Sequence, residues 1–457
     1  MGLPGLGMQG SNQAVYREHE ELVFPCVKPA YWEPLALVEG KGVHVTDANG
    51  KTYLDMFAGI LTTSVGHCHQ EVVERIHRQA SRIGHTSPLY VNEQQVGVAK
   101  RLRAIAPGGL ATCHFTNSGT EAVESAITLA RLYTGRQEII ALRHGYSGSS
   151  TLATNLTAHA RWRPLPDSVV GIKHARSPYT YRNSLDPAED AAEYFVRDIE
   201  EVIATTTSGR PAAFIAETIQ GVGGCIVPPK GYFRRAAEII RSYGGLFICD
   251  EVQTGFGRTG SHWFGIEHWE VTPDIMVMAK GIANGFPVGA TIARPEIAAC
   301  WTARAVSTFG GNPVAMAAAA ATLDVMSRED TPGRSEARGR QLRAGLEALH
   351  ARHAWIGEVR GMGLMQALEL VVDRDAKVPD PARATALLEA SGEEGLLLGV
   401  GGLEGHVIRL GPSLLVTQTE IAEALERLGR ACVRAEIMDV WCHRRTMADS
   451  VIKILQL

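Results

Sequence analysis

Between about Pro107 and Pro313, short apolar runs alternate with longer stretches that repeat apolar residues at helical spacing. Buried strands that alternate with helices are typical of a mainly parallel sheet covered by helices. The pattern predicts one helix that begins near Thr120 and another over Tyr232–Ser242. It also predicts strands at Cys113–Phe115, Glu138–Leu142, Ala212–Ala216, Leu246–Cys249 and Ile275–Met278.

The regions on either side have a different pattern. Gly42–Thr46 and Lys51–Asp55 are rich in β-forming residues, and the turn-forming cluster between them predicts strand, turn, strand. Near the other end, Asn312 suits an N-cap and Pro313 the first turn of a long helix. We therefore expect an α/β protein with an N-terminal segment (13–64) that joins a small domain, a large domain (65–315), a small α+β domain (316–435) and a tail (436–457) of open placement.

Length and composition narrow the class of protein. A chain of 457 residues is too long for one core, and 45% hydrophobic residues with 21% charged residues are ordinary for a soluble protein. The net charge of −4 argues against nucleic acid or a membrane surface as a partner. The 8 cysteines are scattered, and the N-terminus resembles neither a signal nor a transit peptide, so we expect a cytoplasmic location.

The first candidate for chemistry is the turn before the helix that begins near Thr120. Ser118 and Thr120 carry hydroxyl groups, and Gly119 lets a ligand approach the backbone. The first N–H groups of a helix lack partners and lie at its positive end, which favours a bound phosphate. A plain helix N-cap has the same residue pattern, and this motif alone does not separate the two.

Two strand ends carry the other candidates. The apolar run Leu246–Cys249 ends in Asp250 and Glu251, and a carboxylate there can keep a pyridinium nitrogen protonated. The run Ile275–Met278 leads to Lys280, where burial favours the neutral amine that a Schiff base requires. Taken alone, such an acid is more often a solvated helix cap, and such a lysine more often a surface residue.

The combination of the three motifs decides between these alternatives. They follow in chain order on successive strand–helix units, whose strand ends meet at one edge of a sheet. A phosphate, a ring nitrogen and an aldehyde carbon are the three groups by which a protein can bind pyridoxal 5′-phosphate (PLP). We therefore predict a PLP enzyme in which Lys280 carries the cofactor. His67 and His69 have no completing ligand pair nearby in the sequence, so we expect no metal.

Further segments resemble the class III (ω) aminotransferases of the fold-type I PLP enzymes, and in particular the members similar to alanine–glyoxylate aminotransferase 2. The resemblance runs from about Leu37 to about Leu428. It implies transfer of an amino group from an amino acid or primary amine to a keto acid or aldehyde, of the pyruvate or glyoxylate type, by a ping-pong mechanism. It also implies a homodimer with its active site at the subunit interface. The segments that carry it are Tyr53–Gly59, Ser64–His69, Asn117–Glu121, Asp250–Gly260, Met278–Gly289 and Ser307–Pro313.

The resemblance also implies roles for single residues. Lys280 forms the Schiff base and shuttles the proton, and Asp250 pairs with the ring nitrogen. Arg409 binds the α-carboxylate of the substrate. The further cofactor-binding residues are Ser118, Gly119 and Thr120 at the phosphate, Tyr146 and Val252 against the ring faces, Gln253 at the ring hydroxyl, Glu217 close by, and Thr308 from the partner subunit.

One departure and two alternatives accompany this prediction. The family has an aromatic residue, histidine and glycine beside the ring, whereas this chain has Tyr146, Ser147 and Gly148, which leaves the histidine's contribution open. A PLP-dependent phospho-lyase acting on an amino-alcohol phosphate would use the same lysine. A protein that binds PLP without catalysis is the alternative from another class.

Overall fold

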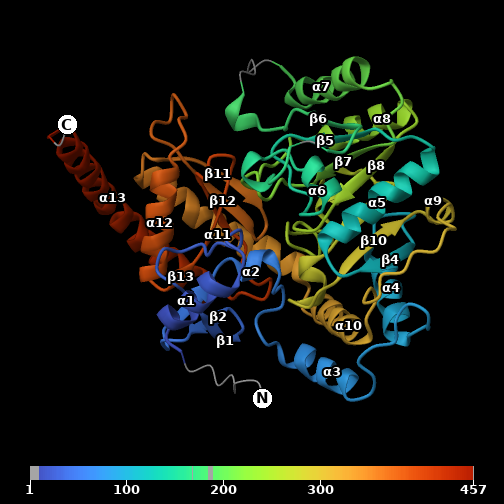
Figure 1. The fold of residues 1–457 in the computed structure, drawn as a ribbon, viewed down its shortest axis with the longest axis horizontal. Coiled ribbons are helices and arrows are strands. Elements are labelled where there is room, and N and C mark those ends of the chain that lie inside the picture. The colour runs from blue at the N-terminus through green and yellow to red at the C-terminus, as the bar shows by residue number, and fades with distance from the viewer. Residues whose placement is uncertain (1–9, 167, 184–188, 456–457) are drawn as a thin grey trace.

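A sheet of seven strands forms the centre of the larger lobe (Figure 1). The computed structural model describes residues 10–166, 168–183 and 189–455, with the backbone alone from residue 438 onward. The sheet has the order β4-β10-β9-β8-β7-β5-β6, and β9, β8, β7, β5 and β6 run parallel. The strands are β4 (Thr112–Thr116), β5 (Ile139–Leu142), β6 (Ile172–Ala175), β7 (Ala213–Glu217), β8 (Leu246–Asp250), β9 (Ile275–Met278) and β10 (Gly289–Ala293).

All five strands predicted between Pro107 and Pro313 lie in this sheet, so the predicted fold class is confirmed. Two strands were missed. β6 pairs along one side only and is half-buried, and β10 consists mostly of small residues and runs antiparallel to both of its neighbours. Neither has the continuous apolar run by which a buried strand is recognised in a sequence.

Helices cover both faces of the sheet because successive strand residues point to opposite sides. Phe214 and Phe247 pack with the helices α7 (Ala191–Thr206) and α8 (Tyr232–Ser242) on one face. Ile215 and Ile248 pack with α5 (Gly119–Thr134) on the other. The remaining helices of this lobe are α3 (Gln70–Ala80), α4 (Glu93–Ile105), α6 (Thr151–Leu156), α9 (Pro295–Ala298) and α10 (Pro313–Arg328), with 3-10 turns η1 (Ala160–Trp162), η2 (Thr180–Arg182), η3 (Gly265–Trp269) and η4 (Lys280–Ala283).

The smaller lobe contains two four-stranded sheets and draws on both ends of the chain (Figure 1). One sheet has the order β1-β2-β3-β13, in which β13 pairs parallel with β3, and the other has the order β11-β12-β15-β14. Its strands are β1 (Leu37–Lys41), β2 (His44–Asp47), β3 (Thr52–Asp55), β11 (Ile356–Met362), β12 (Met365–Leu370), β13 (Leu396–Leu397), β14 (Gly399–Gly401) and β15 (Val407–Leu410). Its helices are α1 (Asn12–Leu22), α2 (Ala58–Leu61), α11 (Thr331–Arg352), α12 (Pro381–Glu393) and α13 (Gln418–Leu455).

The predicted domain boundaries do not coincide with the ends of helices. α10 runs through the predicted boundary at 315/316, and α13 runs through the one at 435/436 and projects away from the smaller lobe (Figure 1). Whether the predicted segments fold as separate domains stays a prediction. None of the helices in the described residues is long and apolar enough to cross a membrane.

Candidate active site

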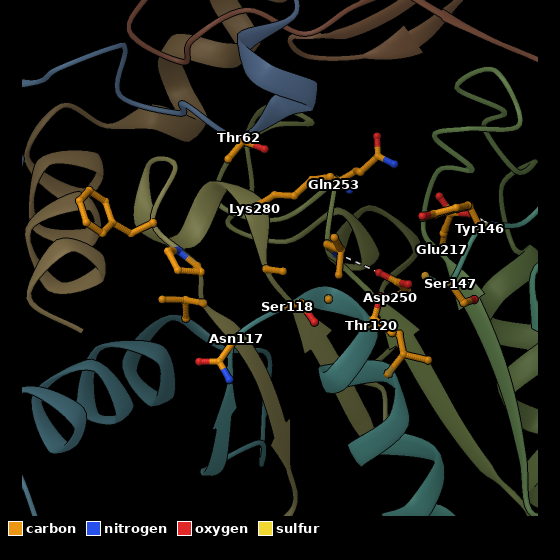
Figure 2. Close-up of a pocket in the computed structure, with 18 of the residues that line it drawn as sticks. Thr62, Asn117, Ser118, Thr120, Tyr146, Ser147, Glu217, Asp250, Gln253 and Lys280 are labelled. Atoms are coloured by element: carbon orange, nitrogen blue, oxygen red, sulfur yellow. Dashed lines mark hydrogen bonds between the residues drawn. The ribbon is translucent and has the colours of Figure 1, made fainter. Parts of the chain in front are cut away.

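A cavity of about 330 Å³ lies where β7, β8 and β9 end and α5 begins (Figure 2). Nine of the residues predicted for the site line it together: Ser118, Gly119, Thr120, Tyr146, Glu217, Asp250, Val252, Gln253 and Lys280. The strand order explains this convergence, because β7, β8 and β9 are parallel neighbours and their carboxyl ends open on the same side.

Two carboxylates and an amine follow these adjacent strand ends. Glu217 and Asp250 are register partners on β7 and β8, and Lys280 comes two positions after the end of β9. Burial raises the pKa of Glu217 to about 7 and that of Asp250 to about 6. Burial lowers the pKa of Lys280, although the nearby acids oppose this shift. The cavity thus holds an amine whose neutral form is favoured beside a buried acid.

The structure separates the roles of the two adjacent acids at the end of β8. Asp250 lines the cavity, and its Oδ1 accepts a hydrogen bond from the Val252 N–H at 3.0 Å. Glu251 points into the protein, where its carboxylate accepts hydrogen bonds from Thr218, Thr254, Gly265 and Ile266 at distances of 2.6–3.0 Å. Glu251 therefore holds the structure behind the site, and Asp250 is the acid that faces the cavity.

The turn before α5 is a helix N-cap that also faces the cavity. Ser118 is the N-cap, because its Oγ accepts a hydrogen bond from the Glu121 N–H at 3.2 Å. The next two residues line the cavity, and the first N–H groups of a helix have no partner inside it. The Thr120 hydroxyl lies against the loop after Tyr146 and accepts a hydrogen bond from the Ser149 N–H at 3.3 Å.

Glu217 fixes two backbone segments, one of which lines the cavity. Its Oε1 accepts a hydrogen bond from the Tyr146 N–H at 2.9 Å, and its Oε2 accepts one from the Gly221 N–H at 2.8 Å. The Tyr146 ring packs edge-on against Trp162, with ring centroids 5.5 Å apart. Ser147, which replaces the family's histidine, also lines the cavity.

Arg409 lies behind the cavity wall rather than in it. Its side chain on β15 is 3% exposed, and its Nη2 donates a hydrogen bond to Oε1 of Gln253 at 2.6 Å. The guanidinium also lies 5.3 Å from the ring centroid of Phe57. Gln253 was expected to contact the cofactor's ring hydroxyl; here its oxygen accepts from Arg409, and the ring contact stays a prediction.

Thr308 is exposed and does not line the cavity of its own chain. This position leaves its predicted role in a partner subunit as a prediction. His67, considered above as a metal ligand, bonds to Asp55 at 2.9 Å. No group of three or more possible metal ligands was found in the part of the chain that the structure describes.

Sequence reasoning missed several residues of the cavity wall. Val123 lies one helical turn after Thr120, so helical spacing could have identified it. Phe286 lies in the segment Met278–Gly289, in which only Lys280 was given a role. Thr62 follows α2, whose four residues all have positive φ values of 50–68° and form a left-handed turn that no simple pattern in the sequence indicates.

The residues present fit PLP. An amine whose pKa is lowered, an acid and a helix N-terminus with a neighbouring hydroxyl line one cavity. A methyl group built onto Gly119 would lie 3.5 Å from both Val252 and Ala279, so the glycine keeps this side of the cavity open. These groups match the aldehyde, the ring nitrogen and the phosphate of the cofactor.

Comparisons with known proteins agree with this chemistry. The family model described as aminotransferase class III matches residues 28–432. Alanine–glyoxylate aminotransferase 2 homolog 2 of Arabidopsis thaliana is 40% identical over 91% of this chain and 87% of its own length. Acetylornithine aminotransferase of Methanopyrus kandleri is 39% identical over 87% of this chain and 94% of its own. An amine transaminase from an uncultivated Pseudomonas species, solved with PLP bound, has a TM-score of 0.83 and 33% identity over 88% of this chain and 95% of that one.

The chain belongs to the class III aminotransferase family. It is a PLP-dependent enzyme that transfers amino groups between small amines or amino acids and keto acids. The relatives named above are all aminotransferases or transaminases, which disfavours the phospho-lyase and non-catalytic alternatives.

Proposed function

We propose that the amino donor is an α-amino acid or a primary amine and that the acceptor is a small keto acid or aldehyde such as pyruvate or glyoxylate. The observation that carries this proposal is the buried guanidinium of Arg409 behind a cavity that contains Lys280. A guanidinium binds a carboxylate through two parallel hydrogen bonds, which suits an amino acid and its keto acid. The similarity to an alanine–glyoxylate aminotransferase supports this class of substrate.

Each residue of the cavity has a proposed task. Bound PLP supplies an aldehyde that condenses with amines and a ring that accepts the electrons of a broken Cα–H bond. Lys280 holds the cofactor, and its Nζ then takes the proton from the donor's Cα, a step helped by the lowered pKa of the amine. Asp250 keeps the ring nitrogen protonated, and the turn at Ser118, Gly119 and Thr120 binds the phosphate.

We propose further that the active form is a homodimer. Support comes from two neighbouring loops that expose large apolar residues: Leu89, Tyr90 and Val91 in one, Val306 and Phe309 in the other. The loops touch, since the rings of His85 and Phe309 lie 5.3 Å apart. Exposed apolar clusters of this kind often mark interfaces. In such a dimer Thr308 would contact the phosphate of the partner subunit.

The cytoplasmic location inferred from the sequence stays a prediction. Fractionation of the native cells, followed by detection of the protein in each fraction, tests it.

The amino-transfer proposal is tested with purified enzyme loaded with PLP. Donors such as L-alanine and simple primary amines are offered with pyruvate or glyoxylate, and the new amino acid is measured by chromatography. We expect transfer by the wild type and none by Lys280→Ala. Phosphate release from an amino-alcohol phosphate without amino transfer would overturn the proposal.

The dimer proposal needs a separate experiment. Light scattering gives the mass of the wild type in solution. If Thr308 serves the partner subunit, mixing Lys280→Ala subunits with Thr308→Ala subunits yields hybrids in which one site carries both substitutions and the other carries neither. Activity of the mixture above that of either variant is the expected result, whereas a monomeric mass would contradict the proposal.

A further inference from the structure

We infer that two glycines of β14, Gly399 and Gly401, hold Arg409 and Phe57 in a fixed arrangement that selects substrates with a carboxylate next to the reacting amine. This inference rests on the proposed function and adds to it the positioning residues that determine substrate class. Two observations support it: Arg409 has no carboxylate partner among the described residues, and the strand beside it has glycines where a side chain would clash.

The charge of Arg409 lacks an anionic partner. Among the described residues, no carboxylate lies within ion-pair distance of its guanidinium, and its buried Nε has no hydrogen-bond partner. The neutral oxygen of Gln253 is the acceptor that the structure gives it. A buried cation in this state is unfavourable, and a ligand carboxylate would remove the imbalance. The free Nε–H is a donor still available to such a ligand.

The glycines of β14 provide the space that this arrangement needs. Gly399 is the register partner of Arg409 on the neighbouring strand β15. A methyl group built onto Gly401 would lie 2.6 Å from Cδ of Arg409, and one built onto Gly399 would lie 2.2 Å from Cζ of Phe57. Neither glycine has a positive φ, so the backbone conformation does not require glycine at these positions. The glycines are required because a side chain would not fit.

Phe57 and Gln253 complete the arrangement. The Phe57 ring lies over the guanidinium. The Phe57 backbone N–H donates a hydrogen bond to Oδ1 of Asp55 at 2.9 Å, which fixes the backbone from which the ring extends. Gln253 holds the Nη2 end. The guanidinium is therefore confined by the ring, by Gly401 and by an amide, and it has little room to move away from an apolar substituent. A donor without a carboxylate must leave this cation uncompensated, which disfavours its binding.

The strand also offers a matched control. Val400 lies between the two glycines, and its side chain is 38% exposed, on the side of β14 away from Arg409. Val400→Ala changes the same strand without adding an atom near the guanidinium. A general weakening of β14 would therefore affect Val400→Ala and Gly401→Ala alike, whereas a positioning effect would affect Gly401→Ala alone.

The experiment compares L-alanine with isopropylamine, in which a methyl group replaces the carboxylate. The ratio of their kcat/KM values is measured with the PLP-loaded wild type, Gly401→Ala, Gly399→Ala and Val400→Ala. We expect the wild type to prefer L-alanine. A displacement of a binding group by about 1 Å can reduce rates by about 100-fold, so we expect the ratio to fall by roughly that factor in Gly401→Ala and to stay unchanged in Val400→Ala.

A binding measurement gives a readout independent of turnover. Propionate has the carboxylate of alanine but no amine, and its dissociation constant is measured by calorimetry on the same loaded proteins. We expect weaker binding to Gly401→Ala and unchanged binding to Val400→Ala. If the wild type transferred no amino group from any donor, the proposed function would fail, while propionate binding would still test the arrangement around Arg409.

A double variant tests the route through Phe57 and covers the case in which Gly401→Ala does not fold. Leucine at position 57 lacks the Cζ atom with which the new methyl group of Gly399→Ala would clash. We therefore expect Gly399→Ala/Phe57→Leu to bind propionate better than Gly399→Ala. Three results would overturn the inference. The glycine variants could keep the propionate binding and the substrate ratio of the wild type, they could lose activity equally with both amines, or the double variant could fail to recover propionate binding.

Discussion

The molecule buries charged groups in two places that differ in how the charges are satisfied. Between the lobes, the Glu369 carboxylate accepts hydrogen bonds from Tyr179, Arg182 and Arg360. Arg360 also donates to the carbonyl of Gly224 at 2.7 Å. In the cavity region, by contrast, the hydrogen-bond acceptor of Arg409 among the described residues is the neutral Gln253, and the Lys280 amine lines an open space. In the first cluster the protein itself pairs opposite charges, whereas among the described residues no carboxylate pairs with the guanidinium of the second.

This difference separates structure from function better than burial alone does. Both clusters consist of groups that are costly to remove from water. Where the protein pairs opposite charges, the ion pairs join η2 to β11 and β12 and so connect the two lobes. Where an opposite charge is missing, a ligand can supply it, and ligand chemistry becomes possible. Substitutions in the two clusters should therefore have different consequences.

The largest expected effect is the loss of activity in Lys280→Ala. Without the amine, the cofactor has no covalent anchor and the donor's Cα has no base, so we expect transfer to fall below detection. The folded protein should survive, because the substitution removes a buried amine that has no complete set of partners. Activity with L-alanine and pyruvate is measured beside the thermal unfolding midpoint; normal turnover would rule out the role of this lysine.

Glu369→Gln should act on stability. The substitution removes the carboxylate that pairs with Arg182 and Arg360 and leaves Arg360 with Glu358 alone. Breaking a buried ion pair costs about 3–5 kcal/mol of folding free energy. The ratio of kcat/KM for L-alanine and isopropylamine should hardly change at a temperature where the variant is folded. Denaturant unfolding and the two-substrate assay check this prediction, and a large change in the ratio without loss of stability would contradict it.

Arg409→Met should act on specificity. Methionine keeps much of the volume but removes the charge, so a carboxylate loses its buried partner, at a cost of about 2 kcal/mol or more, which is a factor of roughly 30. We expect this loss in kcat/KM for L-alanine but not for isopropylamine. Equal losses for both substrates would mean that Arg409 has only a structural role.

The smallest expected effect is on how the stability of the cofactor-free protein depends on pH. Burial raises the pKa of Glu217 to about 7, above its value of about 4.3 in an unfolded chain. The folded state therefore binds this proton more tightly, and the stability that it contributes is complete below about pH 4 and is lost as the pH rises towards 7. In Glu217→Gln this loss disappears, so the unfolding midpoint of the wild type should fall relative to that of the variant between pH 5 and 8.

Local patterns predicted the strands and the convergence of the site because each motif lies on one strand–helix unit. They could not distinguish Asp250 from Glu251, which are adjacent and acidic but point in opposite directions. The cluster around Glu369 could not be predicted for a different reason. Tyr179 and Glu369 are 190 positions apart, and Arg182 and Glu369 are 187 apart, so their contact depends on how the two lobes meet. The bond between Gln253 and Arg409 spans 156 positions and was missed for the same reason.

The sheet shared by both ends of the chain also has a consequence for biosynthesis. The hydroxyl of Tyr31 bonds to the backbone of Leu398, 367 positions later. At about 5–20 residues per second, the ribosome needs roughly 20–70 s to make the chain between them. During that interval β3 cannot pair with β13, and Phe57 cannot pack against Arg409. The early strands are thus exposed to misassembly until translation is nearly complete, and chaperones that hold nascent chains would find their binding sites there.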